Sequence, residues 1–365
     1  MVAPTSVWVI VVVVVAAGVG GLGFWAGYEY RGSPASSPGA VVNSTLSVLG
    51  AGTLNTVFPE VANVLVNETP GISAPVAAQT YEGSLDVTTA VSSLAAKVDV
   101  AAVADFRLIP QLLKPTYASY EVVFASTPEV LVYNPSIAAF DGINSSNWGS
   151  KLSSAVSTTG VAPFAVWNAS TDPNGYNEIF SMMLQGMLYD DANVSAVYSH
   201  FYSGAAGGFA VPNPSVTKNE KEGQAASLLS TGVVSSLITY RAYAAFNHLS
   251  YVNLDPIVGL GANNTTALAD YAKLSTTILS SSGNDEKVYP APVLFAATVP
   301  TNAPNPALGA AFLHLLLSPQ GSALLATDGA FTPIFPAWVD TPGSVSSVLA
   351  PDVVPLPGWA AAFLG

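Results

Sequence analysis

The feature that most constrains this chain is an alternation of short β-branched runs with helical patterns. Strand-like runs at 45–52, 73–81 and 98–105 are separated by helical patterns at 54–66 and 87–96. Helices of this length between strands form right-handed crossover units, so we expect these strands to pair mostly in parallel. The first part of the globular chain therefore predicts an α/β lobe.

A second series of the same kind follows farther along the chain. Its expected elements are a strand at 161–167, helices at 176–189 and 222–230, strands at 233–240 and 292–299, and a helix at 307–317 preceded by Pro306. Between the two series, Glu121 to Asn134 contains two strand-like runs separated by a proline, long enough to leave one sheet and enter another. We therefore predict two α/β lobes with mixed sheets, helices on both faces and a hinge of crossing strands.

The length and composition agree with two lobes. The chain has 365 residues, of which 50% are hydrophobic, and it exceeds the size at which a single core stops growing. Only 9% of the residues are charged and the formal net charge is -13, which excludes a basic nucleic-acid surface. The net field of such a chain would not capture an anion, so any anion site must be local.

The residue content also disfavours catalysis. The chain has no cysteine, which excludes disulfides, thiolate metal sites, a cysteine nucleophile and a lipid anchor on an N-terminal cysteine. The three histidines, His200, His248 and His314, are scattered without metal-ligand spacing, and no P-loop or dinucleotide motif occurs. We therefore expect no enzyme activity and no cofactor.

The N-terminal segment is expected to lead the chain out of the cytoplasm. Val7 to Tyr28 is uncharged and close in length to the roughly 20 residues of a membrane-spanning helix. We interpret residues 1–30 as a transmembrane anchor or a cleaved signal, and residues 31–42 as a tether rich in Pro, Ser and Gly. Arg31 would favour the opposite orientation, but Glu29 lies near it and long domains translocate largely regardless of charge.

N-glycosylation sequons agree with an exported surface. They begin at Asn43, Asn67, Asn144, Asn168, Asn193, Asn263 and Asn264. We therefore expect the globular chain on the extracellular face of the membrane, or secreted if the N-terminal helix is cleaved. Its expected divisions are 43–126 for the first part of lobe 1, 127–249 for lobe 2, 250–345 for the return segment of lobe 1 and 346–365 for a C-terminal tail.

A set of short motifs occurs in order between about Leu49 and Pro336. They are AGTL (51–54), EGSL (82–85), VDVAAVADFRLIPQLL (98–113), NW (147–148), STDPNGY (170–176), KEGQAASLLSTG (221–232), TYRAYA (239–244) and VPTNAPNPALGAAFLHLLLSPQG (299–321). In these motifs the chain resembles the archaeal molybdate/tungstate-binding protein family, the soluble receptors of oxyanion ABC importers. The resemblance implies a type II periplasmic-binding-protein-like fold, tungstate or molybdate as ligand, and an ABC permease with its ATPase subunit as partners.

Two glycine–hydroxyl pairs stand where an oxyanion can be bound. Gly52-Thr53 and Gly83-Ser84 each follow a strand-like run and precede a helical one, so backbone N–H groups, a helix dipole and a hydroxyl can converge on an anion. Plain helix capping is the alternative role of both hydroxyls. The resembled family mostly has Ser where Thr53 stands, and Ala104 is a further possible backbone donor.

The resemblance implies that Asp172 and Glu222 bind the metal centre of the oxyanion directly. Carboxylates repel a plain oxyanion, but they can bond a high-valent metal as hard oxygen donors and raise its coordination number. Sulfur and phosphorus do not expand in this way, so such ligands would select molybdate and tungstate against sulfate and phosphate.

Each of these residues also has a structural alternative. Asp172 would be a turn or helix-entry residue, and Glu222 a partner of a helix dipole, with Glu220 as the competing ligand candidate. Tyr240 matches a family tyrosine whose hydroxyl would donate to an oxo group, or it is a buried strand aromatic.

Two other functions stay open on the sequence alone. A receptor for another oxyanion, such as sulfate or phosphate, predicts that Asp172 and Glu222 are dispensable. A non-catalytic surface-layer or adhesive protein is suggested by the sequons and the low charge, and it predicts no stabilisation by a small molecule.

Overall fold

The computed structural model describes residues 44–75, 78–158, 163–201, 216–219, 222–279 and 285–364, without the side chains of residues 200, 201, 216–219, 222, 223 and 279. All of them belong to one compact unit, Val42–Gly365. The expected anchor or signal (1–30), the tether (31–42) and Glu220 lie outside the described residues.

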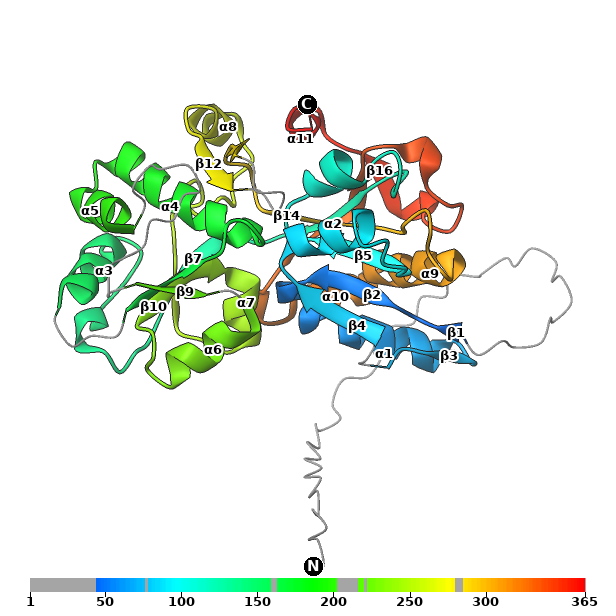
Figure 1. The fold of residues 1–365 in the computed structure, drawn as a ribbon, viewed down its shortest axis with the longest axis horizontal. Coiled ribbons are helices and arrows are strands. Elements are labelled where there is room, and N and C mark those ends of the chain that lie inside the picture. The colour runs from blue at the N-terminus through cyan, green and yellow to red at the C-terminus, as the bar shows by residue number, and fades with distance from the viewer. Residues whose placement is uncertain are drawn as a thin grey trace, which may run out of the picture. The chain divides into compact units, whose positions relative to one another are not determined.

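The first lobe is built on a seven-stranded sheet of described residues with the order β16-β15-β6-β14-β5-β2-β4 (Figure 1). Its strands are β2 (Val48–Ala51), β4 (Gln79–Glu82), β5 (Val100–Val103), β6 (Val122–Ser126), β14 (Leu294–Thr298), β15 (Thr332–Val339) and β16 (Val353–Pro355). β2 and β5 are buried along their whole length, as expected for strands covered on both faces. β2 pairs in parallel with β4 and β5, whereas β14 is antiparallel to β5 and β6, so the sheet is mixed.

Helices cover both faces of this sheet. They are α1 (Phe58–Glu68), α2 (Ser84–Ser92), α9 (Pro306–Leu317) and α10 (Pro319–Leu325). The chain passes from β2 outward to β4 and then back across β2 to β5, so right-handed crossovers place α1 and α2 on opposite faces. α1 packs against α9 and α10, and the ring of Phe58 contacts Phe124 of β6 and Phe312 of α9 in the core.

The second lobe is built on a sheet with the order β11-β7-β10-β8-β9 among the described strands. Its strands are β7 (Glu129–Tyr133), β8 (Phe164–Trp167), β9 (Val216–Asn219), β10 (Ser236–Tyr240) and β11 (Tyr251–Asn253), and its helices are α3 (Trp148–Ser157), α4 (Pro173–Tyr189), α5 (Ala192–Phe201), α6 (Glu222–Ser230) and α7 (Arg241–Phe246). β10 is parallel to β8 and antiparallel to β7, so this sheet is also mixed.

Smaller elements complete the described chain. They are the paired strands β1 (Ser44–Thr45) and β3 (Ile72–Ser73), the hairpin β12 (Thr276–Leu279) and β13 (Asp285–Val288), the helices α8 (Thr265–Tyr271) and α11 (Gly358–Ala361), and the short turns η1 (Gly52–Asn55), η3 (Ile109–Leu113), η4 (Ala138–Phe140), η5 (Thr327–Gly329), η6 (Pro342–Ser344) and η7 (Ala350–Asp352). Within the part of the chain that the structure describes, no single helix is long and apolar enough to span a membrane, although α9 and α10, bent by 71° at their junction, would be if taken together.

The chain crosses between the lobes at Thr127-Pro128. β6 on one side belongs to the first sheet and β7 on the other to the second, which confirms two strands in two sheets at the predicted hinge. The crossing is tied to two other segments, because the Glu129 N–H donates to Gly259 O at 2.7 Å and the Arg241 N–H donates to Pro128 O at 2.8 Å. A methyl group on Gly259 would lie 2.7 Å from Glu129 O, so only glycine allows this approach.

The strand and helix alternation is confirmed, but two expected divisions differ from the structure. The return segment was expected from residue 250, yet β11 continues the antiparallel edge of the second sheet by pairing with β7. Residues 346–365 were expected to form a tail. They instead contribute β16 to the first sheet, and Trp359 packs edge-on against Trp338 with ring centroids 5.6 Å apart. In both cases apolar residues gain burial by joining an existing sheet edge or core surface.

Candidate functional site

The expected binding residues follow the carboxyl ends of strands in both lobes. β2 leads into η1 and β4 leads through Gly83 into α2, while β8 leads into the loop before Asp172 and Tyr240 is the last residue of β10. In open α/β sheets, ligands bind outside the carboxyl ends of the strands. Each lobe therefore presents its expected residues where the fold binds ligands.

The two hydroxyl residues of the first lobe are buried, with Thr53 2% and Ser84 1% exposed. Neither is the N-cap of its helix, since those positions are held by Ala51 and Gly83 without side-chain cap bonds. Ser84 Oγ instead accepts a hydrogen bond from the backbone N–H of Ala104 at 2.9 Å. This bond uses a lone pair of Ser84 and not its proton. The Ala104 N–H, considered above as a ligand donor, is thus directed at Ser84.

The N-terminus of α2 touches the second lobe. The Leu85 N–H donates to Thr171 O at 3.1 Å, and a methyl group on Gly83 would lie 2.2 Å from the same oxygen. Only a glycine at position 83 allows the two backbones to approach this closely. Ser84 is therefore brought beside the loop that precedes Asp172.

Asp172 is partly buried and is the N-cap of α4. Its Oδ1 accepts a hydrogen bond from the Asn174 N–H at 2.9 Å, and Pro173 occupies the first helical position. Burial raises the pKa of Asp172 to about 6, and the charge of Asp86 in the first turn of α2 acts in the same direction, against the Asn174 N–H. The structural alternative, helix entry, is thus observed, and the carboxyl group also has an unusual affinity for its proton.

Tyr240 lies buried at the end of β10, with 1% of its surface exposed. The Asn177 amide of α4 donates from Nδ2 to Tyr240 Oη at 3.4 Å, and the Tyr240 ring meets Phe295 edge-on at 5.6 Å. Glu222 is the first residue of α6, which contacts η1 of the first lobe, where Thr53 lies. The side chain of Glu222 lies outside the described residues, so its role stays a prediction.

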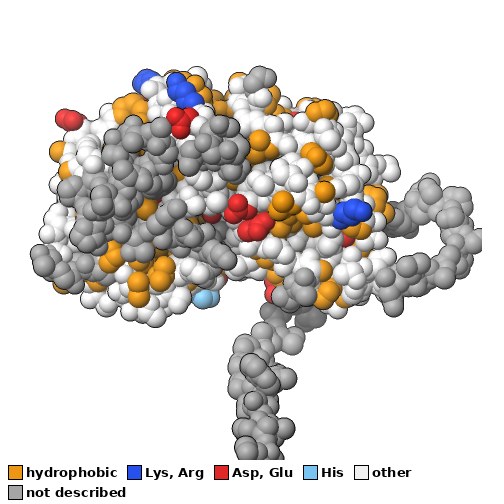
Figure 2. Space-filling view, viewed as in Figure 1, with side chains coloured by type: hydrophobic (Ala, Val, Ile, Leu, Met, Phe, Trp, Pro, Cys, Tyr) orange, Lys and Arg blue, Asp and Glu red, His pale blue; other side chains and the backbone are white. Residues whose placement is uncertain are grey.

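Contacts therefore link the expected segments in one region. Gly83 and Ser84 meet the loop before Asp172, α6 meets η1, and Tyr240 is joined to α4. Among the described side chains, no group of three or more His, Cys, Asp or Glu is placed to hold a metal ion. On the face drawn in Figure 2, the coloured Lys and Arg side chains are few and scattered, so the described part of this face shows no basic patch.

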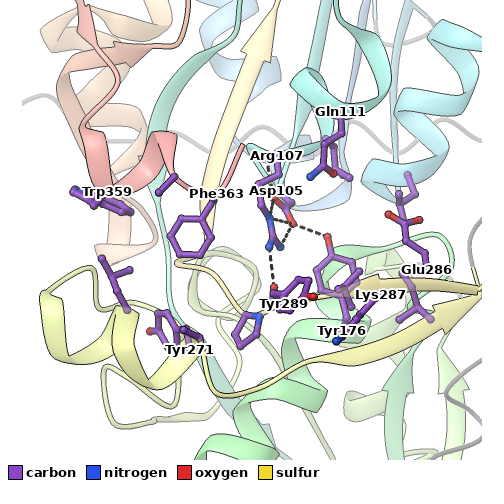
Figure 3. A pocket seen from close by; sticks show the side chains of 18 residues that line it. Asp105, Arg107, Gln111, Tyr176, Tyr271, Glu286, Lys287, Tyr289, Trp359 and Phe363 are labelled. Carbon is purple, nitrogen blue, oxygen red and sulfur yellow. Dashed lines mark hydrogen bonds and ion pairs between the residues drawn. The ribbon is translucent and has the colours of Figure 1, made fainter. Parts of the chain in front are cut away.

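A hydrogen-bonded triplet at the meeting of the lobes was not predicted (Figure 3). Tyr176 of α4 donates from Oη to Asp105 Oδ2 at 2.7 Å, and Arg107 binds both oxygens of Asp105 with contacts of 2.6 to 3.1 Å. Arg107 Nη1 also donates to Tyr289 O at 2.8 Å. The motifs VDVAAVADFR and STDPNGY contain these residues. The pairing of an acid and a base two positions apart, Asp105 and Arg107, was the only sequence signal.

Asp105 and Arg107 stay charged, and Tyr176 stays neutral. Burial is the largest single influence and by itself would raise the pKa of Asp105 and lower that of Arg107. The attraction between the two charges and their hydrogen bonds together outweigh it, so the pKa of Asp105 is lowered and that of Arg107 is raised. Burial and the negative charge of Asp105 raise the pKa of Tyr176 well above its usual value, so Tyr176 remains a hydrogen-bond donor.

A pocket of about 550 Å³ adjoins the triplet. Asp105, Arg107 and Tyr176 form part of its wall. Aliphatic, polar and aromatic side chains line the rest, and Figure 3 shows the aromatic ones, Tyr271, Tyr289, Trp359 and Phe363. Leu85, next to Ser84, also lines the pocket. The pocket therefore shares a wall with the segments that carry the expected binding residues.

Known proteins resemble this chain in sequence and in fold. The molybdate/tungstate-binding protein WtpA of Pyrococcus abyssi is 28% identical over 254 residues, covering 66% of this chain and 70% of the relative. The protein of the same name from Thermococcus kodakarensis is 27% identical over 251 residues, with 66% and 68% covered. These relatives confirm the resemblance inferred from the motifs.

Among solved structures, the periplasmic molybdate-binding protein of Azotobacter vinelandii matches with a TM-score of 0.52 at 14% identity, covering 79% of this chain and 98% of that one. At this identity the likeness shows the fold, which is the two-lobed type II periplasmic-binding-protein fold. The model of the family described as bacterial extracellular solute-binding protein matches residues 46–330. The chain therefore belongs to the bacterial extracellular solute-binding protein family.

Proposed function

We propose that this chain is the receptor of an ABC importer that captures tungstate or molybdate outside the cytoplasm and delivers it to the permease. Family membership supports the receptor role, and two archaeal relatives that are molybdate/tungstate-binding proteins support the ligand. The receptor acts by binding and release without catalysis, and the ATPase partner supplies the energy of transport. Residues 1–30 anchor it at the extracellular face, or are cleaved to release it; this part rests on the sequence alone.

The observation that carries the ligand assignment is the meeting of Ser84 with the Asp172 loop. The Leu85 N–H at the start of α2 donates to Thr171 O, which holds the N-terminus of α2, with Ser84 as its first residue, against the loop that leads to Asp172. In the proposed complex, the N–H groups near Gly52 and Gly83 and the hydroxyls of Thr53, Ser84 and Tyr240 bind oxo groups. The carboxylates of Asp172 and Glu222 bind the metal atom.

The local charge favours a metal-centred oxyanion over sulfate or phosphate. Burial raises the pKa of Asp172, and the negative charge of Asp86 in α2 adds to this effect. Two acids at an anion site would repel an oxyanion whose central atom accepts no further ligand. The tungsten or molybdenum atom can accept such a carboxylate oxygen as a further ligand, so a bond offsets the repulsion between the two negative charges.

One observation favours a second candidate, a receptor for sulfate or phosphate. Asp172 Oδ1 accepts the Asn174 N–H, which is the geometry of a purely structural N-cap. In that case Asp172 would stabilise α4 and contribute nothing to ligand choice.

Isothermal titration of the full chain in mild detergent with tungstate, molybdate, sulfate and phosphate separates these functions. Heat from the first two anions alone supports the proposal. Binding of sulfate or phosphate with similar affinity supports the second candidate. If none of the four anions gives binding heat, the result would favour the surface-layer or adhesive function.

A further inference from the structure

We propose that Tyr176, Asp105 and Arg107 form a latch that holds the two lobes closed and thereby sets how long the ligand stays bound. The inference rests on the proposed receptor function and goes beyond it, because it concerns residues outside the expected ligand set.

The latch joins groups from different lobes. Asp105 and Arg107 follow β5 of the first sheet, whereas Tyr176 lies in the first turns of α4, which follows β8 of the second sheet. The Tyr176 Oη to Asp105 Oδ2 distance is 2.7 Å, and the three residues are 2%, 6% and 8% exposed in the order Tyr176, Asp105 and Arg107. A hydrogen bond from a neutral donor to a buried carboxylate is among the stronger ones in proteins.

Arg107 prepares Asp105 for this contact. It approaches Asp105 with Nε and Nη2 and also donates its backbone N–H to Oδ1 at 3.0 Å, so the carboxylate is held in one orientation without help from the second lobe. Nη1 is held by Tyr289 O of the segment after β13. When the lobes separate, the arginine pair stays intact, and of the contacts within the latch only the Tyr176 bond breaks. The latch therefore opens without leaving an unpaired charge.

The latch is placed next to the expected ligand residues of both lobes. Asp105 directly follows Ala104, whose N–H holds Ser84 Oγ at 2.9 Å. Tyr176 lies one helical turn after Asp172 on α4. Because these neighbours are rigidly connected, the Tyr176 bond forms only when Ser84 and Asp172 are brought together.

The surroundings allow the latch to open without unfolding. Its three residues line the pocket of about 550 Å³ and so do not face packed side chains on every side. Breaking the bond therefore exposes the pocket wall and leaves the core of each lobe intact.

The test is Tyr176→Phe in the full chain, which removes the hydroxyl and keeps the ring. The matched control is Tyr271→Phe, because Tyr271 lines the same pocket but donates its hydroxyl to Ile257 O and Ala262 O within its own segment. Stopped-flow measurement should show tungstate dissociating about tenfold faster from Tyr176→Phe, with the association rate and the tungstate-to-molybdate affinity ratio unchanged. Dissociation within twofold of the unmodified chain would overturn the latch.

A second measurement tests the latch without any ligand. The chain has no cysteine, so Leu94→Cys in the first lobe and Val233→Cys in the second, at positions 75% and 50% exposed, accept spin labels selectively. The distance between the two spin labels reports which fraction of the molecules is closed. This population of closed molecules should fall in Tyr176→Phe and should be unchanged in Tyr271→Phe. If the unmodified chain binds neither anion while this population falls, the proposed ligand is wrong and the latch stands. If the population is unchanged in Tyr176→Phe, the latch is wrong whatever the chain binds.

Discussion

Asp172 combines a structural and a proposed binding role in one side chain. Its Oδ1 caps α4 through the Asn174 N–H, and its carboxylate is the proposed ligand of the metal. Asparagine is as good an N-cap as aspartate but offers no anionic oxygen. The two roles can therefore be separated by a single substitution.

At about pH 4, where Asp172 is protonated and as neutral as an amide, we expect Asp172→Asn to change the free energy of unfolding by less than about 0.5 kcal/mol. At about pH 7 we expect the same substitution to weaken tungstate and molybdate binding at least about tenfold. Titration calorimetry and thermal unfolding measure the two effects. The control is Asp190→Asn at the other end of α4, where a left-handed residue with φ 50° is exposed and suits asparagine. Unchanged affinity in Asp172→Asn would contradict metal ligation and favour the capping role alone.

The pKa of Asp172 predicts opposite pH trends for binding and for stability. The folded pKa of about 6 lies above the ordinary 3.8, so the folded ligand-free chain binds this proton more tightly than the unfolded chain. The resulting stability is fully present below about pH 4 and is lost as the pH rises through about 6. Metal ligation needs the carboxylate, so affinity should instead fall as the pH drops through about 6.

Measuring the dissociation constant and the melting temperature from about pH 7.5 to about pH 4.5 checks both trends. Asp172→Asn should flatten the contribution of this residue to each curve, because its amide does not titrate. Identical curves for the variant and the unmodified chain would show that other groups control the pH response.

At the scale of elements, the decisive contact is that between the start of α2 and the loop before α4. The Leu85 N–H donates to Thr171 O, and Gly83 leaves room for this approach because a methyl group there would lie 2.2 Å from the same oxygen. The positive end of a helix is in this way turned toward the second lobe, where an oxyanion would lie between the two.

We therefore expect Gly83→Ala to weaken ligand binding at least about tenfold while the melting temperature of the ligand-free chain changes little, since the added methyl opposes closure more than folding. Gly343→Ala is the control, because a methyl group at that position meets no atom within 4 Å. Calorimetric affinity of Gly83→Ala equal to that of the control would mean that this close approach is not needed for binding.

At the scale of the whole molecule, the two sheets are joined by chain segments that cross between them. β6 and β7 are separated only by Thr127-Pro128, and the return crossing lies between β11 and β14. The two-residue crossing between β6 and β7 is short enough to act as a hinge, because a few residues absorb the change in backbone angles.

Saturating tungstate should therefore lower the radius of gyration of the full chain and raise its stability. At a ligand concentration of about one hundred times the dissociation constant, the free energy of unfolding should rise by about 2.7 kcal/mol. Small-angle scattering and thermal unfolding test this, with sulfate as the comparison anion. Binding heat without any change in the radius would contradict hinge closure.

The sequence by itself determined most local elements and the residue types of the expected site. Buried strands such as β2 and β5 and helices such as α4 and α9 follow from hydrophobic runs and from proline at helix starts, which are properties of neighbouring residues. The hydroxyls after β2 and β4 and the acid before α4 were also visible as local motifs. Their assignment to a ligand came from the resemblance and stays a proposal.

Tertiary structure alone decided which sheet edges gained an extra strand and which distant side chains became hydrogen-bond partners. The addition of β11 and β16 to existing sheets depends on surfaces that distant segments leave uncovered, so no local pattern marks it. The Tyr176 to Asp105 bond joins residues 71 positions apart in different lobes, and the burial that strengthens it exists only when the lobes meet. Neighbouring residues set the local backbone preference. Long-range packing determines which distant polar groups are buried side by side and must therefore bond to each other instead of to water.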